Sequence, residues 1–135
     1  MRIIKSILLL LILPFISCNS NNSFTKAENA LDAGREFIDG FLTGNFDKAT
    51  FFMLNDSINV KYLLIQKKIY NPKSNEEKKQ LKESSIIINE ESIINDSIHI
   101  INFKNSFDKV PRVIKVILRN KEWKVDLKYS FNGNL

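Results

Sequence analysis

The most constraining feature of this 135-residue chain is a change in the spacing of its apolar residues near position 84. Before this position, apolar residues recur every three or four places, which is typical of helices with one buried face. Beyond it, apolar and polar residues alternate, which is typical of strands. Helices followed by consecutive strands predict a fold of the mixed α+β class.

The first half predicts three helices. Residues 25–28 read Thr-Lys-Ala-Glu, a capping-box pattern that predicts the start of a long amphipathic helix, and Gly44 is a suitable stop for it. Asn45 is expected to cap a second, short helix. A third helix is expected over about residues 58–69, before Pro72 breaks the pattern. Its apolar stripe consists of Ile58, Tyr62, Ile65 and Ile69.

Residues 74–83 are rich in Lys and Glu, and Ser74 and Glu77 have capping-box spacing. This segment is expected to be either a short exposed helix or a mobile linker. Four strands are predicted beyond it, and they are expected to form an antiparallel meander. The predicted strands are residues 85–91, 97–105, 112–119 and 122–130. The pairs Asn95-Asp96 and Asn120-Lys121 suit tight turns, because Asn tolerates the left-handed backbone conformation.

The last predicted strand alternates most clearly. One face is expected to point into the core and carries Trp123, Val125, Leu127 and Tyr129. The other face is expected to meet water and carries Lys124, Asp126 and Lys128. Residues 24–135 suit one domain with one hydrophobic core, because the chain is too short for two.

The N-terminus resembles a bacterial lipoprotein signal. Arg2 and Lys5 precede a short apolar run, which is the architecture of a secretory signal over residues 1–17 and is too short to span a bilayer. The sequence Phe-Ile-Ser-Cys that ends at Cys18 resembles a lipobox. This resemblance implies cleavage before Cys18 and attachment of lipid to its thiol. Residues 18–23 would then supply the lipidated cysteine and a polar, flexible tether.

The location of the anchor is predicted from the residues after Cys18. In some Gram-negative groups, acidic residues at this point resemble a surface-export signal, and none occurs between Cys18 and Lys26. We therefore expect the protein on the periplasmic face of a Gram-negative membrane, with the cell surface as the alternative. Cys18 is the only cysteine, so the fold must be stable without an intramolecular disulfide.

Composition excludes several functions. The chain carries a net charge of +5, but its lysines are spread out and do not form a stripe with interleaved aromatic residues, so no nucleic-acid partner is predicted. The sequence has no glycine-rich phosphate loop, no nucleophile elbow and no cluster of Cys and His residues. We therefore predict no cofactor and no metal site.

The order of elements, with Leu-Thr-Gly-Asn-Phe-Asp-Lys-Ala at residues 42–49 and Glu-Trp-Lys-Val-Asp at residues 122–126, resembles the nuclear transport factor 2-like superfamily. It is most similar to the small lipoproteins of unknown function within that superfamily. The resemblance implies N-terminal helices packed on a curved antiparallel sheet of about four strands, forming a cone. The open end of such a cone often holds a pocket, and homodimers through the sheet are common.

The resemblance also suggests residues to inspect. Enzymes of the superfamily use pocket Asp, Tyr or His side chains to take a proton. His99 alternates with Ile101 and Phe103 on a predicted strand, although such a histidine is equally a hydrogen-bonded core or strand-face residue. Asp56 and Tyr62 could reach the cone mouth, but Asp56 also suits a helix cap. Trp123 is expected to fill the space between sheet and helix.

Two functions follow as hypotheses. The first is a membrane-anchored domain that binds a small ligand or an envelope protein without catalysis. The alternative is a small pocket enzyme resembling the isomerases or dehydratases of the superfamily. The state of the cone discriminates between them: an open cavity lined by His99 favours chemistry, whereas a filled cone with an exposed apolar face favours a protein partner.

Overall fold

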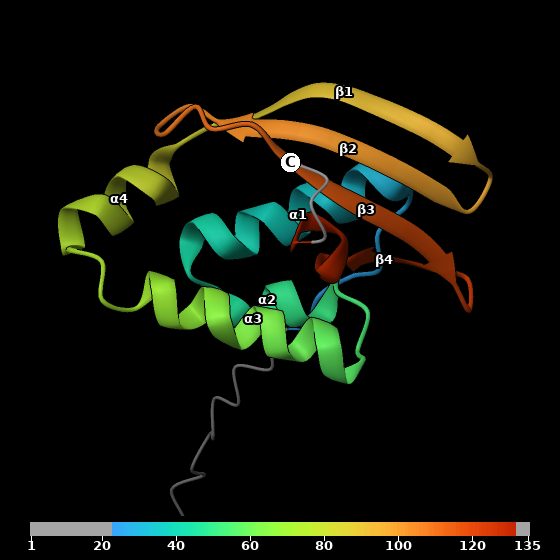
Figure 1. Cartoon of the computed structure of the whole chain (residues 1–135), viewed down its shortest axis with the longest axis horizontal. Helices are drawn as coiled ribbons and strands as arrows, with labels where there is room; N and C mark the ends of the chain where they lie inside the picture. The colour runs from blue at the N-terminus through green and yellow to red at the C-terminus, as the bar shows by residue number, and fades with distance from the viewer. Residues whose placement is uncertain (1–22, 132–135) are drawn as a thin grey trace, which may run out of the picture.

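Helices occupy the first half of the chain and an antiparallel sheet the second, in a computed structural model that describes residues 23–131 (Figure 1). The described helices are α1 Ala30–Thr43, α2 Phe46–Phe51, α3 Ser57–Tyr70 and α4 Asn75–Glu83. The strands are β1 Ile86–Asn95, β2 Ile98–Asn105, β3 Arg112–Arg119 and β4 Glu122–Asp126, followed by the 3-10 helix η1 Leu127–Phe131. The predicted α+β class and the meander, with order β1-β2-β3-β4, are confirmed. The predicted signal segment and Cys18 lie outside the described residues.

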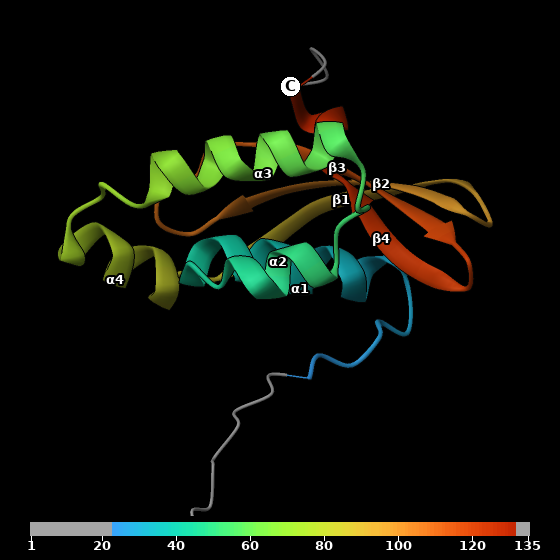
Figure 2. The ribbon, with the colours of Figure 1, turned by 90° about the horizontal axis from the view of Figure 1, so that it is seen from below.

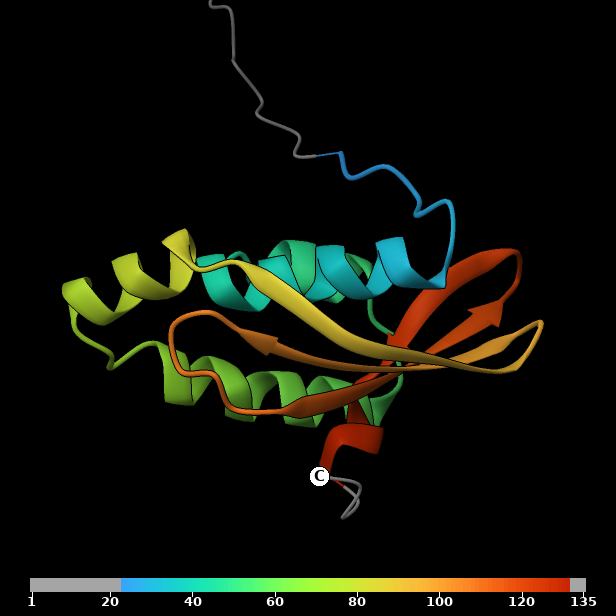
Figure 3. The same ribbon diagram turned by 90° about the horizontal axis from the view of Figure 1, so that it is seen from above.

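The sheet curves over α1, and α2 and α3 lie on the side of α1 away from the sheet (Figure 1). Seen from above, α1 and α3 lie on opposite sides of the view, and the strands pass in front of the space between them (Figure 3). The apolar face of α1 meets the inward face of the sheet, and the two together form the centre of the hydrophobic core. This arrangement agrees at the coarse level with the expected cone.

The long helix begins later than predicted. Asn29, not Thr25, is its N-cap, because the Asn29 side chain accepts a hydrogen bond from the Asp32 amide at 2.8 Å. The residues before Asn29 are not helical, and the Phe24 ring instead packs against Phe51, with ring centroids 5.6 Å apart. The predicted stop at Gly44 is confirmed, and its φ of 70° is a conformation that favours glycine.

Gly40 allows α1 and α2 to approach closely. A Cβ at Gly40 would lie 2.8 Å from the Ala49 amide nitrogen and 3.0 Å from the Asn45 carbonyl oxygen, so backbone atoms would have to move. We expect Gly40→Ala to lower the free energy of unfolding by about 1 to 2 kcal/mol, because overpacking outweighs the better helix propensity of alanine. Chemical denaturation measures this change.

Gly34→Ala is the matched control on the same helix. A Cβ at Gly34 would meet the Cδ1 atoms of Ile101 and Ile114, at 2.7 and 3.2 Å, and these side-chain ends can turn away. We therefore expect a smaller loss from Gly34→Ala than from Gly40→Ala. Equal losses would contradict the assignment of the Gly40 effect to backbone contact.

The strands follow the predicted alternation with two corrections. β1 continues to Asn95, with irregular register between Ile88 and Glu90 and again near the turn. The turn between β3 and β4 is confirmed, since Asn120 and Lys121 have φ values of 52° and 62°. Both lie in the left-handed region that two-residue hairpin turns require.

The last strand ends at Asp126 instead of continuing to residue 130. The edge of β4 away from β3 is also hydrogen-bonded, because the Val125 amide donates to the Phe52 carbonyl at 2.7 Å and the Val125 carbonyl accepts from the Leu54 amide at 2.9 Å. Asp126 was expected to face water, yet its exposed fraction is 3 %. Its burial under α3 and η1, and the hydrogen bonds it makes there, turn the chain out of the sheet.

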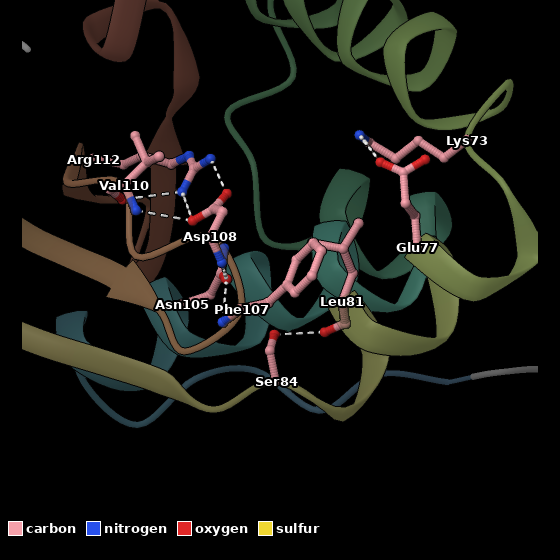
Figure 4. A network of polar contacts seen from close by, with 9 residues as sticks. All are labelled: Lys73, Glu77, Leu81, Ser84, Asn105, Phe107, Asp108, Val110 and Arg112. Atoms are coloured by element: carbon pink, nitrogen blue, oxygen red, sulfur yellow. Dashed lines mark hydrogen bonds and ion pairs between the residues drawn. The ribbon is translucent and has the colours of Figure 1, made fainter.

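Local side-chain hydrogen bonds define the start of α4 and the loop from β2 to β3. The capping box of Ser74 and Glu77 is present. The segment at residues 74–83, which was expected to be either a helix or a linker, is therefore the helix α4. In the loop from β2 to β3, the buried Asn105 side chain accepts from the amides of Phe107 and Asp108, at 3.0 and 2.9 Å (Figure 4). Figure 4 also shows the Phe107 side chain extending toward α4. The hydrogen bonds from Arg112 hold the pKa of Asp108 below its usual range.

Candidate functional site

The interior of the cone is filled. Ile101, Val116 and Val125 at the centre of the sheet are fully buried, and at Gly34 of α1 even an added Cβ would press on Ile101 and Ile114. Shallow depressions lie on the outside of the described residues. One, of about 590 Å³, lies between the N-terminal segment and α1, and another, of about 340 Å³, lies beside the turn from β3 to β4. Neither is lined by His99, Tyr62, Asp56 or Trp123.

His99 and Trp123 are in contact on the sheet. The His99 ring meets the Trp123 ring edge to face, with centroids 5.1 Å apart. His99 Nδ1 lies 2.7 Å from Glu91 Oε1. His99 is therefore held on both sides by side chains of its own sheet.

Glu91 is a partner that sequence reasoning missed, because nothing in the local sequence distinguishes it from a solvated surface charge. The turn predicted at Asn95-Asp96 offered a signal, although β1 extends through Asn95, the turn falls at residues 96 and 97, and Asn95 is not left-handed. This hairpin folds β1 back on β2 and pairs Ile93 with His99. A carboxylate beside an imidazole can orient the ring for proton transfer. Such chemistry also requires space for a substrate next to the ring, and neither depression provides it.

Asp56 and Tyr62 lie elsewhere, on α3. Asp56 is the N-cap, since its Oδ1 accepts from the amides of Ile58 and Asn59 at 3.1 and 2.9 Å, which confirms the helix-cap interpretation. The hydrogen bond from the Asn59 amide, with others, lowers the pKa of the Asp56 carboxyl. The predicted candidate residues thus form two groups, one on the sheet and one on α3.

Asn59 links the start of α3 to the end of the sheet. Its buried side-chain amide donates to Asp56 Oδ2 at 2.7 Å and to Asp126 Oδ1 at 3.1 Å. Its Oδ1 accepts from the Lys128 backbone amide at 2.8 Å. The side-chain amide nitrogen of Asn59 and its side-chain oxygen therefore all have hydrogen-bond partners.

The Asp126 carboxylate is balanced by two cations. Lys128 Nζ lies 2.9 Å from Asp126 Oδ1, and Lys115 Nζ lies 3.4 Å from Oδ2. The hydrogen bond to Asp126 raises the pKa of Lys128. No buried side-chain polar atom among residues 23–131 lacks a hydrogen-bond partner. We interpret this network as structural, because its groups satisfy one another and none is left for a ligand.

The apolar stripe of α3 faces outward. Ile58, Ile65 and Ile69 have exposed fractions of 51, 39 and 54 %, whereas Leu63 on the opposite side is buried. The Tyr62 ring stacks on the exposed Phe131 ring of η1, with centroids 4.5 Å apart and planes 2° from parallel. We call this surface the α3 stripe: Ile58, Tyr62, Ile65, Ile69 and Phe131.

Comparison of the chain with protein-family models, with curated proteins and with solved structures gave no match. Within residues 23–131, no helix has the length and apolar content needed to cross a membrane. In the same part of the chain, no group of three or more His, Cys, Asp or Glu side chains is arranged to hold a metal ion.

Proposed function

We propose that this chain is a lipid-anchored protein of the cell envelope. Residues 1–17 direct export and are removed, Cys18 carries the lipid, and residues 19–23 tether the domain to the periplasmic face of a membrane. The basic and then apolar N-terminus followed by the lipobox-like residues supports this proposal. The order of helices and sheet agrees, at the coarse level, with the resemblance to a nuclear transport factor 2-like domain.

We further propose that the domain acts by binding a partner and not by catalysis. The observation that supports this role is the filled cone, combined with apolar residues on the outside of α3. A cone closed by its own side chains offers its outer surfaces, not its interior, to other molecules. Exposed apolar residues on adjacent helical turns are typical of interaction sites.

A small pocket enzyme is the second candidate, and the 2.7 Å contact between His99 and Glu91 favours it. In this case a small molecule would bind near the ring. His99→Phe keeps a ring against Trp123 and removes the proton-carrying nitrogens. If a ligand found by thermal-shift screening stabilises the wild type and not the variant, the enzyme candidate gains support; equal stabilisation would argue against it.

The lipid anchor is tested by Cys18→Ser in the full chain. We expect the wild type to incorporate labelled palmitate and to partition into the detergent phase of a phase-separation assay, because two or three acyl chains anchor a protein almost permanently. The variant is expected to incorporate no label and either to leave the membrane or to stay unprocessed. Ser17→Ala is the control, since it retains a small residue before the cysteine. Unchanged labelling and partitioning of Cys18→Ser would refute the anchor.

A further inference from the structure

Basic residues gather around the turn between β3 and β4. Arg119 and Lys121 are exposed there, and within residues 23–131 neither of them forms an ion pair. The carboxylate of Glu122 is bound on both sides, because Lys26 Nζ lies 2.6 Å from its Oε1 and Lys124 Nζ lies 3.2 Å from its Oε2. We call these five residues the turn surface: Lys26, Arg119, Lys121, Glu122 and Lys124. Four cations and one carboxylate give it a net positive charge.

The depression of about 340 Å³ beside this turn offers donors for an anionic group. Arg119 and Lys124 line it, together with the exposed residues Asn55 and Asn120. Guanidinium and ammonium groups are the usual partners of phosphate oxygens in proteins, and side-chain amides can donate to the same oxygens. The chemistry of this depression therefore suits a phosphate group.

The N-terminal segment is held against the turn surface. The Phe24 ring packs on Phe51 with centroids 5.6 Å apart, and Lys124 Nζ lies 4.4 Å from the centre of the same Phe51 ring. Seen from below, the described chain begins on the side of α1 and α2 away from α3 (Figure 2). It enters α1 at the end of the molecule where β3 turns into β4 (Figure 2). A tether on this segment thus leaves the domain beside the turn surface.

We propose that the turn surface is a second contact with the membrane and binds the phosphate groups of anionic phospholipids. The physiological setting of this contact rests on the proposed anchor at Cys18. From Cys18 to Phe24 the chain can span at most about 22 Å, so a lipid on Cys18 would keep the turn surface close to the bilayer. Lys and Arg side chains near an anionic bilayer are attracted to it.

The α1 side of the N-terminal segment has the opposite charge. Glu28, Asp32 and Glu36 line the depression of about 590 Å³, and of these three only Glu36 is paired with a cation among the described residues. An anionic bilayer repels these carboxylates and attracts the turn surface. The two charges therefore favour one orientation, in which the domain rests on the turn surface.

The test uses residues 18–135, the proposed mature chain, which contain every described core residue. Their one cysteine, Cys18, is coupled to a maleimide lipid in vesicles that are otherwise rich in phosphatidylglycerol or composed of phosphatidylcholine. The domain is thus anchored at the proposed position whether or not a cell attaches lipid there. Mass spectrometry then follows acetylation of each lysine, because an amine held against phosphate groups reacts more slowly. Circular dichroism establishes that each variant is folded.

Lys121 is expected to react at least about threefold more slowly on the anionic vesicles than on the neutral ones, and added salt should remove the difference. Lys79 on α4 should react equally on both, because α4 and the turn from β3 to β4 lie at opposite ends of the molecule (Figure 1).

Arg119→Gln tests the charge while Lys121 remains as the reporter. We expect the difference in Lys121 reactivity between the two kinds of vesicle to fall below about 1.5-fold, because one of the two unpaired cations is lost. Lys79→Gln is the matched control, since it removes the same charge from an exposed position on α4. In this control the Lys121 difference should stay as in the wild type.

Other outcomes would overturn the proposal. Equal reactivity of Lys121 on both vesicles, or an equal effect of Lys79→Gln, would exclude a contact through the turn surface. Slower reaction of Lys61 and Lys68 instead would place α3 on the bilayer. If soluble glycerol phosphate slows Lys121 as strongly as the vesicles do, the depression is a site for free phosphate compounds and not for a membrane. Because the anchor is attached chemically, failure here leaves the lipidation proposal standing, and failure of the Cys18→Ser test leaves these results unchanged.

Discussion

Asn59→Asp is expected to lower the free energy of unfolding by roughly 3 to 5 kcal/mol at neutral pH. Aspartate has nearly the same shape as asparagine. In the variant, however, a carboxylate oxygen takes the place of the amide group that donates to Asp56 and Asp126. Two hydrogen bonds are lost, and three carboxylates then meet at a buried position. Chemical denaturation measures the difference from the wild type.

The loss should depend on pH in a defined direction. The fold disfavours the ionised form of the new carboxyl, so the native state binds its proton more tightly than the unfolded state does, and stability falls as pH rises. We therefore expect the gap between variant and wild type to narrow between neutral pH and about pH 4, near the ordinary pKa of an aspartic acid. The lowered pKa of Asp56 gives the wild type a contribution that is lost as pH falls through that pKa. The variant lacks the hydrogen bond from the Asn59 side chain that helps to lower this pKa, so its own contribution is smaller and the gap narrows in the same direction.

Asn55→Asp is the control for charge at this end of α3. Asn55 is exposed and lies directly before the N-cap, so the same substitution there should change stability by about 0.5 kcal/mol or less. If both variants lose the same amount, the effect is one of net charge and not of the buried network. A loss from Asn59→Asp that does not change with pH would also contradict the network.

Ile101→Ala is expected to cost about 3 kcal/mol, because it removes a fully buried side chain and leaves a cavity between the sheet and α1. This substitution tests the filled cone on which the proposed binding role depends. Denaturant unfolding measures the change in the free energy of unfolding. The dependence of this free energy on denaturant concentration should be the same in the variant and the wild type.

Ile94→Ala supplies the comparison for Ile101→Ala. Ile94 lies on β1 and is mostly exposed, so its truncation should cost about 0.5 kcal/mol or less. A loss of only about 1 kcal/mol at Ile101 would mean that the space beside it is already open. That result would make the interior of the cone a candidate ligand site again.

Sequence reasoning did well where a signal acts locally. Gly44 ends α1, Asn45 caps α2 and the Ser74 capping box begins α4, because each depends on one side chain and the next few amides. The Asn120-Lys121 turn is equally local. The start of α1 was predicted wrongly, because Thr25 and Asn29 both suit a cap and only packing of Phe24 on Phe51 separates them.

The candidate site was less predictable because it depends on distant partners. Asp126 alternates with core residues and so was expected to face water. It is buried instead, and Asn59, which lies far away in the sequence, donates a hydrogen bond to its carboxylate. Glu91 was not among the candidate residues, because only the hairpin register places it beside His99. Such pairs depend on which elements pack together, and neither the period nor the composition of the chain contains that information.

By itself, the sequence determined the α+β class, the order of the elements and the turn between β3 and β4, because periodicity, caps and left-handed residues act over a few positions. The tertiary structure alone decided which side of α3 is buried. Both sides of that helix are apolar, so local periodicity could not choose between Leu63 and the stripe of Ile58, Ile65 and Ile69. Burial of Asn59 against Asp126 made the choice, and it left the α3 stripe facing solvent.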